Sequence, residues 1–422
     1  MPDPRYRVLA VATHPVQYMT PIFRRMAQHP SLDFHVAYCS LRGAEAGLDP
    51  EFGANIQWDV PVLDGHSWTH VLNRGSGGES FFGLFNPSLS KLIRTGNYDA
   101  VLCFIGYVRA TFWITLFAAK LSNSAFLFGT DANTLAPRDG RSWKTSLKRI
   151  LWPRLFRLAD QVIVPSSGSH ELMRSLGIPS ERVTITPYAV DNQWWMQQAS
   201  CVHRYEVRQA WGAGPQTNVV LFCAKLQPWK RPTDLLRAFA KANISDALLV
   251  FAGEGPLRSQ LESQAATLGV ASSVRFLGFI NQSQLPAVYA SSDLMVLPSE
   301  YEPFAVVVNE AMCCGCPVVT SDRVGASRDL VVPVSPGFVF PCGDVDALAV
   351  ILKNALGDRT RLQSVAHAAR THIQTWSPEA NIAATVEAIR IAASRLHRNP
   401  IEVLSDSATP NPIAPASQKT QE

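Results

Sequence analysis

LPSEYEPFAVVVNEAMCCGCPVVTSD, residues 297–322, is the stretch that says most about how this chain folds. It opens with the end of an apolar strand, and the loop that follows carries Glu302. Helix-forming residues then run from about Phe304 to about Cys314, where a glycine ends the helix. An apolar strand over 317–320 comes next. Strand, helix and strand in this order predict one unit of a parallel α/β sheet.

The same alternation runs in two series along the chain, separated by the polar and aromatic stretch DNQWWMQQASCVH (191–203), which reads as a connection. The 422 residues exceed what one hydrophobic core usually supports. We therefore predict an α/β protein with two Rossmann-like, doubly wound domains that face each other across a cleft, with ligands outside the carboxyl ends of the strands. The predicted strands are 7–12, 33–39, 100–104, 125–128 and 161–165 in the first series, and 218–222, 247–252, 274–277, 294–297 and 317–320 in the second.

Composition describes a folded chain, with 47% hydrophobic and 17% charged residues, and the net charge of +4 gives no argument for a nucleic-acid partner. The N-terminus lacks a signal-peptide core, and no apolar run is long enough to span a bilayer, so we expect a cytoplasmic protein. The eight cysteines are then expected to be reduced thiols. Cys313, Cys314 and Cys316 lack the further Cys or His residues of a zinc site, so no metal is expected.

The beginning of the helix in 297–322 suits a nucleotide sugar. A helix N-terminus offers N–H groups and positive potential to a diphosphate, here from Phe304, Ala305 and Val306. Glu302 could accept hydrogen bonds from sugar hydroxyls, and Glu310, roughly 9 Å further along the axis, could accept them from the ribose. The alternative is that Glu302 only caps the helix electrostatically and that Glu310 is solvated.

The segment resembles the E-x7-E region of glycosyltransferase family 4: Glu302 and Glu310 match both glutamates, and AMCCGCPVV is similar to the run that follows them. The resemblance implies the GT-B fold, transfer with retention of anomeric configuration, a nucleoside diphosphate sugar as co-substrate and no cofactor. Ala305 stands where the family usually has glycine, which narrows the space beside the phosphate.

Two further segments resemble family motifs. In CAKLQPWKRP (223–232), Lys225 and Lys230 fall on the positions of the two basic residues that hold the diphosphate. The alternative is an ordinary solvated basic loop. In VRFLGFI (274–280), the resemblance implies that the backbone around Gly278 and Phe279 approaches the base.

The N-terminal series matches the family less well. His14 follows the first strand, where it could donate to the diphosphate or contact the acceptor, or be a buried histidine with its hydrogen bonds satisfied. Asp131 ends a strand where family members place a catalytic His or Asp, which makes it a candidate for the group near the reacting carbon. A helix N-cap or turn role is equally natural for it.

The predicted boundaries are 1–190 for an acceptor-binding domain, 204–377 for the donor-binding domain, 378–397 for a helix that crosses back, and 399–422 for a disordered tail. Residues 138–157 hold seven basic residues and one acid. A stripe of six apolar residues from Trp143 to Leu158, including Leu155, shares this segment. It is either an ordinary helix docked on the sheet with a solvated basic face, or a surface for an anionic membrane.

These observations predict a retaining glycosyltransferase of the hexosyltransferase type, acting in polysaccharide or glycolipid assembly, with Asp131 and Glu302 as catalytic residues. Its partners would be a nucleotide sugar and a sugar or lipid-linked sugar acceptor, with the protein cytoplasmic or peripheral at the inner face of the membrane. Two alternatives stay open: a sugar-nucleotide epimerase of the same fold, and an inactive sugar-nucleotide-binding partner protein.

Overall fold

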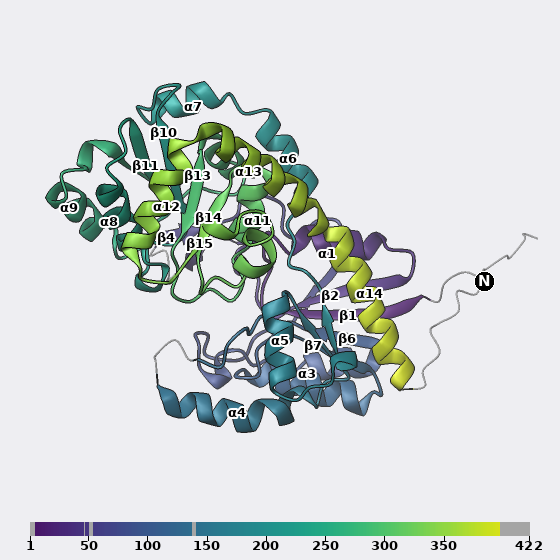
Figure 1. Ribbon diagram of the computed structural model, residues 1–422. Coiled ribbons are helices and arrows are strands. Elements are labelled where there is room, and N and C mark those ends of the chain that lie inside the picture. Colours follow the sequence, from purple (N-terminus) through teal and green to yellow (C-terminus); the bar gives the residue numbers. More distant parts are fainter. Residues whose placement is uncertain (1–4, 46, 50–53, 137–140, 397–422) are drawn as a thin grey trace, which may run out of the picture.

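The computed structural model describes residues 5–45, 47–49, 54–136 and 141–396 (Figure 1). The predicted tail 399–422 and residues 138–140 lie outside this range. Two parallel sheets, each with helices on both faces, make up the described chain, as predicted. Within these ranges, no helix combines the length and apolar character needed to cross a bilayer.

The first sheet has seven parallel strands in the order β5-β2-β1-β6-β7-β8-β9. Its central strands are apolar on both faces and buried, as expected for a sheet covered on two sides. The strands are β1 (Tyr6–Ala12), β2 (Leu32–Tyr38), β5 (Ser67–His70), β6 (Ala100–Cys103), β7 (Ala125–Gly129), β8 (Gln161–Val164) and β9 (Val183–Ile185). A separate antiparallel pair consists of β3 (Gly47–Asp49) and β4 (Ala54–Ile56).

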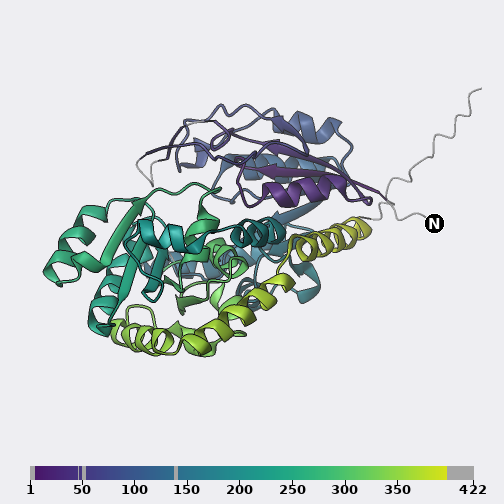
Figure 2. The same ribbon diagram turned by 90° about the horizontal axis from the view of Figure 1, so that it is seen from above.

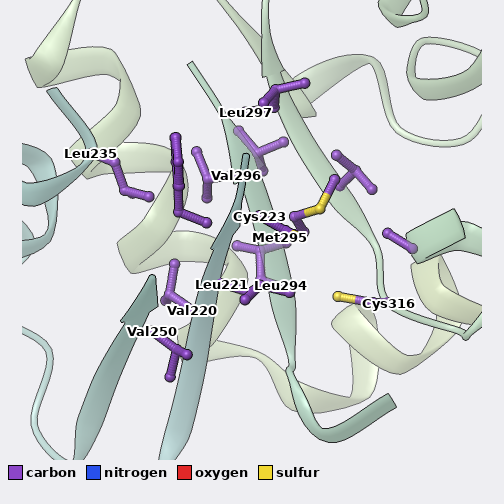
Figure 3. Packing of buried hydrophobic residues seen from close by; sticks show 14 of the residues in the cluster. Val220, Leu221, Cys223, Leu235, Val250, Leu294, Met295, Val296, Leu297 and Cys316 are labelled. Carbon is purple, nitrogen blue, oxygen red and sulfur yellow. The ribbon is translucent and has the colours of Figure 1, made fainter. Parts of the chain in front are cut away.

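The second sheet has six parallel strands in the order β12-β11-β10-β13-β14-β15. Figure 3 shows the apolar side chains of its central strands in contact, among them Val220, Leu221, Leu294 and Met295. The strands are β10 (Asn218–Cys223), β11 (Ala247–Ala252), β12 (Val274–Gly278), β13 (Leu294–Leu297), β14 (Val318–Ser321) and β15 (Val339–Phe340).

Helices cover the first sheet on two sides. On one side lie α1 (Thr20–Gln28) and the last helix, α14 (Pro378–Arg395), which packs on α1 and on β7, β8 and β9. Figures 1 and 2 show α14, in yellow, reaching from the C-terminal half of the chain to the N-terminal half. On the other side lie α2 (Leu89–Thr95), α3 (Ala110–Leu121), α4 (Ser142–Phe156) and α5 (Ser167–Ser175).

The predicted connection 191–203 is mostly helical, because α6 (Asn192–Ser200) buries Trp195 and packs on the second half of the chain. The helix of the opening motif begins two residues later than predicted, as α11 (Val306–Cys313). The remaining helices are α7 (Arg204–Ala210), α8 (Pro232–Ala242), α9 (Arg258–Thr267), α10 (Leu285–Ser291), α12 (Val345–Gly357) and α13 (Arg359–His372).

Candidate active site

Loops at the carboxyl ends of the strands meet between the two sheets. The loop after β7 carries Asp131 and Asn133, and the loop after β13 carries Glu302 and Pro303. Asn133 Nδ2 donates a hydrogen bond to the Pro303 carbonyl oxygen at 3.0 Å. The structure therefore brings the two segments with the predicted catalytic residues, Asp131 and Glu302, into direct contact.

The loop that carries Glu302 is fixed by the backbone on its other side. The N–H groups of Gly325 and Ala326 donate to the carbonyl oxygens of Glu302 and Phe304, each at 2.9 Å. A Cβ added to Gly325 would lie 1.9 Å from the Pro303 carbonyl oxygen, so this approach requires glycine. A candidate site with such a rigid backbone is preorganised for its ligand.

Lys230 and Glu302 form an ion pair between their side chains. Lys230 ends a short 3-10 turn after β10, and both side chains are largely buried, with 18% and 14% of their surface exposed. The pairing places a cation and a carboxylate side by side just ahead of α11. Neither side chain is freely solvated. Glu302 lies near the N-terminus of α11 and is also held by the Lys230 side chain.

Lys225 lies two residues past the end of β10 and is half-buried. Its loop is held against the turn after β11, where a Cβ on Gly253 would lie 2.1 Å from the Ala224 carbonyl oxygen. A Cβ on Gly255 would lie 2.6 Å from the Leu226 carbonyl oxygen. These two glycines thus allow the lysine loop to pack closely, which is more than ordinary turn chemistry.

Ala305 adopts φ 89° and ψ 78° at the N-cap of α11. A residue with a Cβ rarely takes a positive φ, and such a conformation costs about 1–3 kcal/mol. The preceding Phe304 is buried, with its ring stacked on Trp376 at 5.8 Å between centroids. The backbone is therefore strained at Ala305, where the phosphate contact is predicted. The Ala305 side chain also places a methyl group where glycine would have only a hydrogen.

Glu310 is buried within α11, so the expectation that it might be solvated is wrong. The Tyr289 hydroxyl donates to its Oε2 at 2.8 Å, and Cys223 Sγ lies 3.3 Å from the same hydroxyl. Burial raises the pKa of the Glu310 carboxyl to about 8, and the hydrogen bond from Tyr289 partly opposes that rise. Its predicted contact with the ribose stays a prediction.

Phe279 directly follows β12, and its ring lies 6.4 Å from that of Trp58 in the N-terminal half. Beside it, Asn281 Nδ2 donates to the Gln57 carbonyl oxygen at 2.8 Å. The side chain and backbone N–H of Ser283 both donate to Asp59. The segment predicted to approach the base is thus a second place where the two halves of the chain touch.

His14 is half-buried two residues after β1, and its Nδ1 lies 3.0 Å from Thr13 Oγ1. Asp131 is exposed and caps no helix, because the next described helix, α4, has Arg141 as its N-cap. Burial and then the charge of Asp131 raise the pKa of Tyr18 to about 12, and the same causes raise that of Tyr188. The charge of Asp131 therefore acts on both of these tyrosines.

Residue patterns alone did not identify four side chains of this site, and each becomes visible only through a contact between distant segments. Asn133 and Tyr289 bind the two predicted glutamate segments, and the charge of Asp131 acts on Tyr18 and Tyr188. Ring contacts of 6.0 Å between Tyr18 and Tyr188, and of 5.4 Å between Tyr188 and Phe304, connect the N-terminal loop with the start of α11. Tyr188 lies in PYAVD (187–191), the segment just ahead of α6.

Among the residues that the structure describes, no three His, Cys, Asp or Glu side chains are grouped so that they could hold a metal ion. Cys313, Cys314 and Cys316 are buried free thiols whose pKa values burial raises. The arrangement instead offers lysines and backbone N–H groups to an anion.

Comparison with known proteins agrees with this geometry. Residues 204–372 match the model of the glycosyl transferases group 1, and residues 9–189 match a glycosyl transferase 4-like domain. An uncharacterized glycosyltransferase of Methanocaldococcus jannaschii is 31% identical over 240 residues, 56% of this chain and 61% of that protein. A D-inositol 3-phosphate glycosyltransferase of Jonesia denitrificans is 29% identical over 263 residues, 57% and 62% of the two chains. The alignments thus span about three fifths of the length of these relatives.

Solved structures show the same fold over nearly the whole chain. HepE of Anabaena, crystallised in complex with UDP, has a TM-score of 0.69 and 20% identity, with 92% of this chain and 99% of that chain covered. The two family matches agree with the observed fold, which has two parallel sheets and carries Glu302 and Glu310 between β13 and the end of α11. The chain belongs to the group 1 glycosyl transferases, family 4, and has the GT-B fold.

Proposed function

We propose that this protein is a retaining glycosyltransferase that transfers a hexose from a nucleoside diphosphate sugar to an acceptor hydroxyl. The observation that carries the proposal is the Lys230–Glu302 pair, which lies ahead of the α11 N-terminus and beside the loop of Asp131. A cation, a sugar-binding carboxylate and an acid from the opposite domain are what such a transfer needs in one place.

Each residue has a role in this proposal. Lys225, Lys230 and the first N–H groups of α11 stabilise the charge that develops on the leaving nucleoside diphosphate. Donor binding would draw Lys230 from Glu302 to the phosphates, which releases the Glu302 carboxylate to the sugar hydroxyls. Asp131 would stabilise positive charge at the reacting carbon or orient the acceptor.

The base and the sugar are open to direct test. HepE was crystallised with UDP-glucose, so UDP-glucose is the first donor to try on this chain. We further propose that the activity serves polysaccharide or glycolipid assembly in the cytoplasm, at the inner face of a membrane. Lysines and a helix N-terminus replace a cation here, so magnesium or a chelator should change the activity little.

A donor screen tests the proposal. Sugar nucleotides are ranked by thermal stabilisation, which grows with ligand concentration over Kd, and products are then analysed by mass spectrometry. Release of nucleoside diphosphate with transfer or slow hydrolysis of the sugar supports a transferase. Epimerised donor would indicate the epimerase, and binding without any turnover would indicate an inactive binding protein.

Matched variants sharpen the test. Glu302→Gln should greatly reduce turnover while nucleotide binding persists. Glu300→Gln changes a carboxylate two positions earlier that is mostly exposed and pairs with Arg231, so it should leave turnover near wild type. Equal losses in both variants would contradict a specific role for Glu302.

A further inference from the structure

The helix α4 is apolar on two opposite sides. Its inner side packs on the first domain: the Phe156 ring lies 5.5 Å from Phe128 on β7, and Trp152 Nε1 donates to the Tyr107 hydroxyl at 2.9 Å. Leu155 also lies on this buried side. The interpretation of a helix docked on the sheet is thus confirmed for the helix itself, and Leu155 is the one member of the apolar stripe on the docked side. Trp152 and Phe156, which lie outside the stripe, complete that side.

The outer side of α4 carries the rest of the stripe, and it faces solvent. Four of its members recur at intervals of four, three and one residues, which puts them on one side of the helix, and the fifth lies two residues past its end. They are between 42% and 59% exposed, and they are Trp143, Leu147, Ile150, Leu151 and, after the helix, Leu158. Scattered exposed apolar residues are normal, but a contiguous row of this kind marks an interaction surface.

The neighbouring helix α3 extends the same surface. Phe112 of α3 and Phe156 of α4 both contact Phe128, at 4.8 and 5.5 Å, so the two helices cover the same side of β7. The outward side of α3 exposes Phe117 and Leu121, four residues apart, at 59% and 77%. We call these two residues and the five of the α4 stripe the α3–α4 face.

Charge indicates what covers this face. Residues 141–157 include six Arg or Lys residues and no Asp or Glu. Arg154 lies within the stripe, four residues from both Ile150 and Leu158, and is exposed. Within this segment, apolar side chains that include a Trp alternate with cations and with no acid. This pattern complements an anionic bilayer, where the apolar side chains enter the acyl boundary and the cations meet the headgroups.

We infer that the α3–α4 face inserts into the surface of an anionic membrane. The consequence of the inference rests on the proposed function. Both helices of the face cover β7, and Asp131 and Asn133 follow that strand directly, so an acceptor anchored in the membrane would be held close to the cleft. Apolar insertion, rather than charge alone, holds the protein there. Binding should therefore weaken with salt yet persist in part at high salt.

Vesicle sedimentation tests the inference with the full chain. The probes are vesicles of phosphatidylcholine alone and of phosphatidylcholine with phosphatidylglycerol. The wild type should sediment with the anionic vesicles only, and the variant with Trp143→Gln, Leu147→Gln and Ile150→Gln should bind them at least about tenfold more weakly. A control carries the same number of changes on the other domain, Tyr205→Gln, Leu268→Gln and Val350→Gln, all at exposed positions. It should bind like the wild type.

Three outcomes would overturn the inference. The wild type and the α4 variant could sediment equally, or the control variant could lose as much vesicle binding as the α4 variant. The wild type could also fail to bind vesicles and instead form a dimer that the α4 substitutions break. If the α4 variant does not fold, Phe117→Ser with Leu121→Ser on α3 replaces it and should also lose binding. Calorimetry with UDP separates this inference from the proposed function. Vesicle binding without nucleotide binding would leave the membrane face standing and remove the transferase, and the α4 variant should retain wild-type UDP affinity.

Discussion

The two domains of this chain use their surfaces differently. Of the seventeen large hydrophobic side chains exposed in the described structure, thirteen lie before residue 190 and four lie after it. The C-terminal domain instead gathers buried polar groups, Lys230 with Glu302 and Tyr289 with Glu310, around the start of α11. The difference is what the two proposals above require: a C-terminal domain that holds a charged donor and an N-terminal domain that meets an apolar surface.

The largest expected effect tests the donor half of this comparison. Lys230→Met removes one preorganised electrostatic donor and should slow sugar transfer by roughly 10²–10³-fold. Steady-state rates with the donor found in the screen measure it. Lys241→Met, at an exposed position that pairs with Asp346, is the control and should keep the wild-type rate. A Lys230 variant with normal turnover would mean that the cleft holds its phosphates elsewhere.

The contribution of the N-terminal domain to chemistry is tested next. Asp131→Asn removes the charge that raises the pKa values of Tyr18 and Tyr188. It should lower turnover by roughly 10²-fold, while nucleoside diphosphate affinity stays near wild type. Rate assays and calorimetry on one preparation distinguish the two effects. Were nucleotide affinity to fall together with the rate, Asp131 would belong to donor binding, and the division of labour between the domains would be wrong.

How much the sequence could predict follows the same division. In the C-terminal domain, strands β11 and β13 match their predicted limits, and Glu302 and Lys230 could be predicted as neighbours because each lies in a short motif at a strand end. In the N-terminal domain, β5 went unpredicted since all four of its residues are exposed and show no alternation of burial. Periodicity detected the apolar stripe of α4, but it could not say which side of the helix docks.

Contacts between distant elements explain what else was missed. Tyr289 and Glu310 meet only because α10 packs beside α11, and the sequence around either residue does not predict the hydrogen bond between them. The same holds for Asn133, which contacts Pro303 from the other domain. The polar and aromatic stretch 191–203 was expected to be a connection, but most of it forms α6, whose Trp195 is buried. Tertiary packing here outweighs the weak helix propensity of the sequence.

A smaller effect should come from pH at the donor site. The Glu310 pKa is raised from 4.5 to about 8, so the native state keeps a proton that the unfolded chain releases near 4.5. The stability from this group is therefore full below about pH 4.5 and is lost as pH rises through about 8. Ribose hydroxyls would favour the ionised carboxylate, so nucleotide affinity should rise between about pH 7 and 9, by at most about tenfold per pH unit.

Calorimetry of nucleoside diphosphate binding across that pH range measures the effect. Glu310→Gln should abolish the slope and weaken binding at high pH. Tyr289→Phe removes the hydrogen bond that lowers the Glu310 pKa, so the rise in affinity should move to higher pH. If Glu310→Gln kept the same pH dependence of affinity, that dependence would come from the phosphates of the ligand, and Glu310 would not belong to the ribose site.

The smallest expected effect concerns the strain beside the phosphates. Ala305 has φ 89°, a conformation that glycine adopts without a Cβ penalty, so Ala305→Gly should raise the free energy of unfolding by about 1 kcal/mol. The matched control is Ala368→Gly at an exposed position within α13, where glycine should lower it by about 0.5–1 kcal/mol. Denaturant titrations measure both changes. Opposite signs would show that the native backbone stores strain where the donor is expected, and the donor screen repeated on Ala305→Gly would then show whether the missing methyl widens the choice of sugar. Equal losses in the two variants would mean that the backbone at Ala305 is relaxed and that a glycine is not favoured at this position.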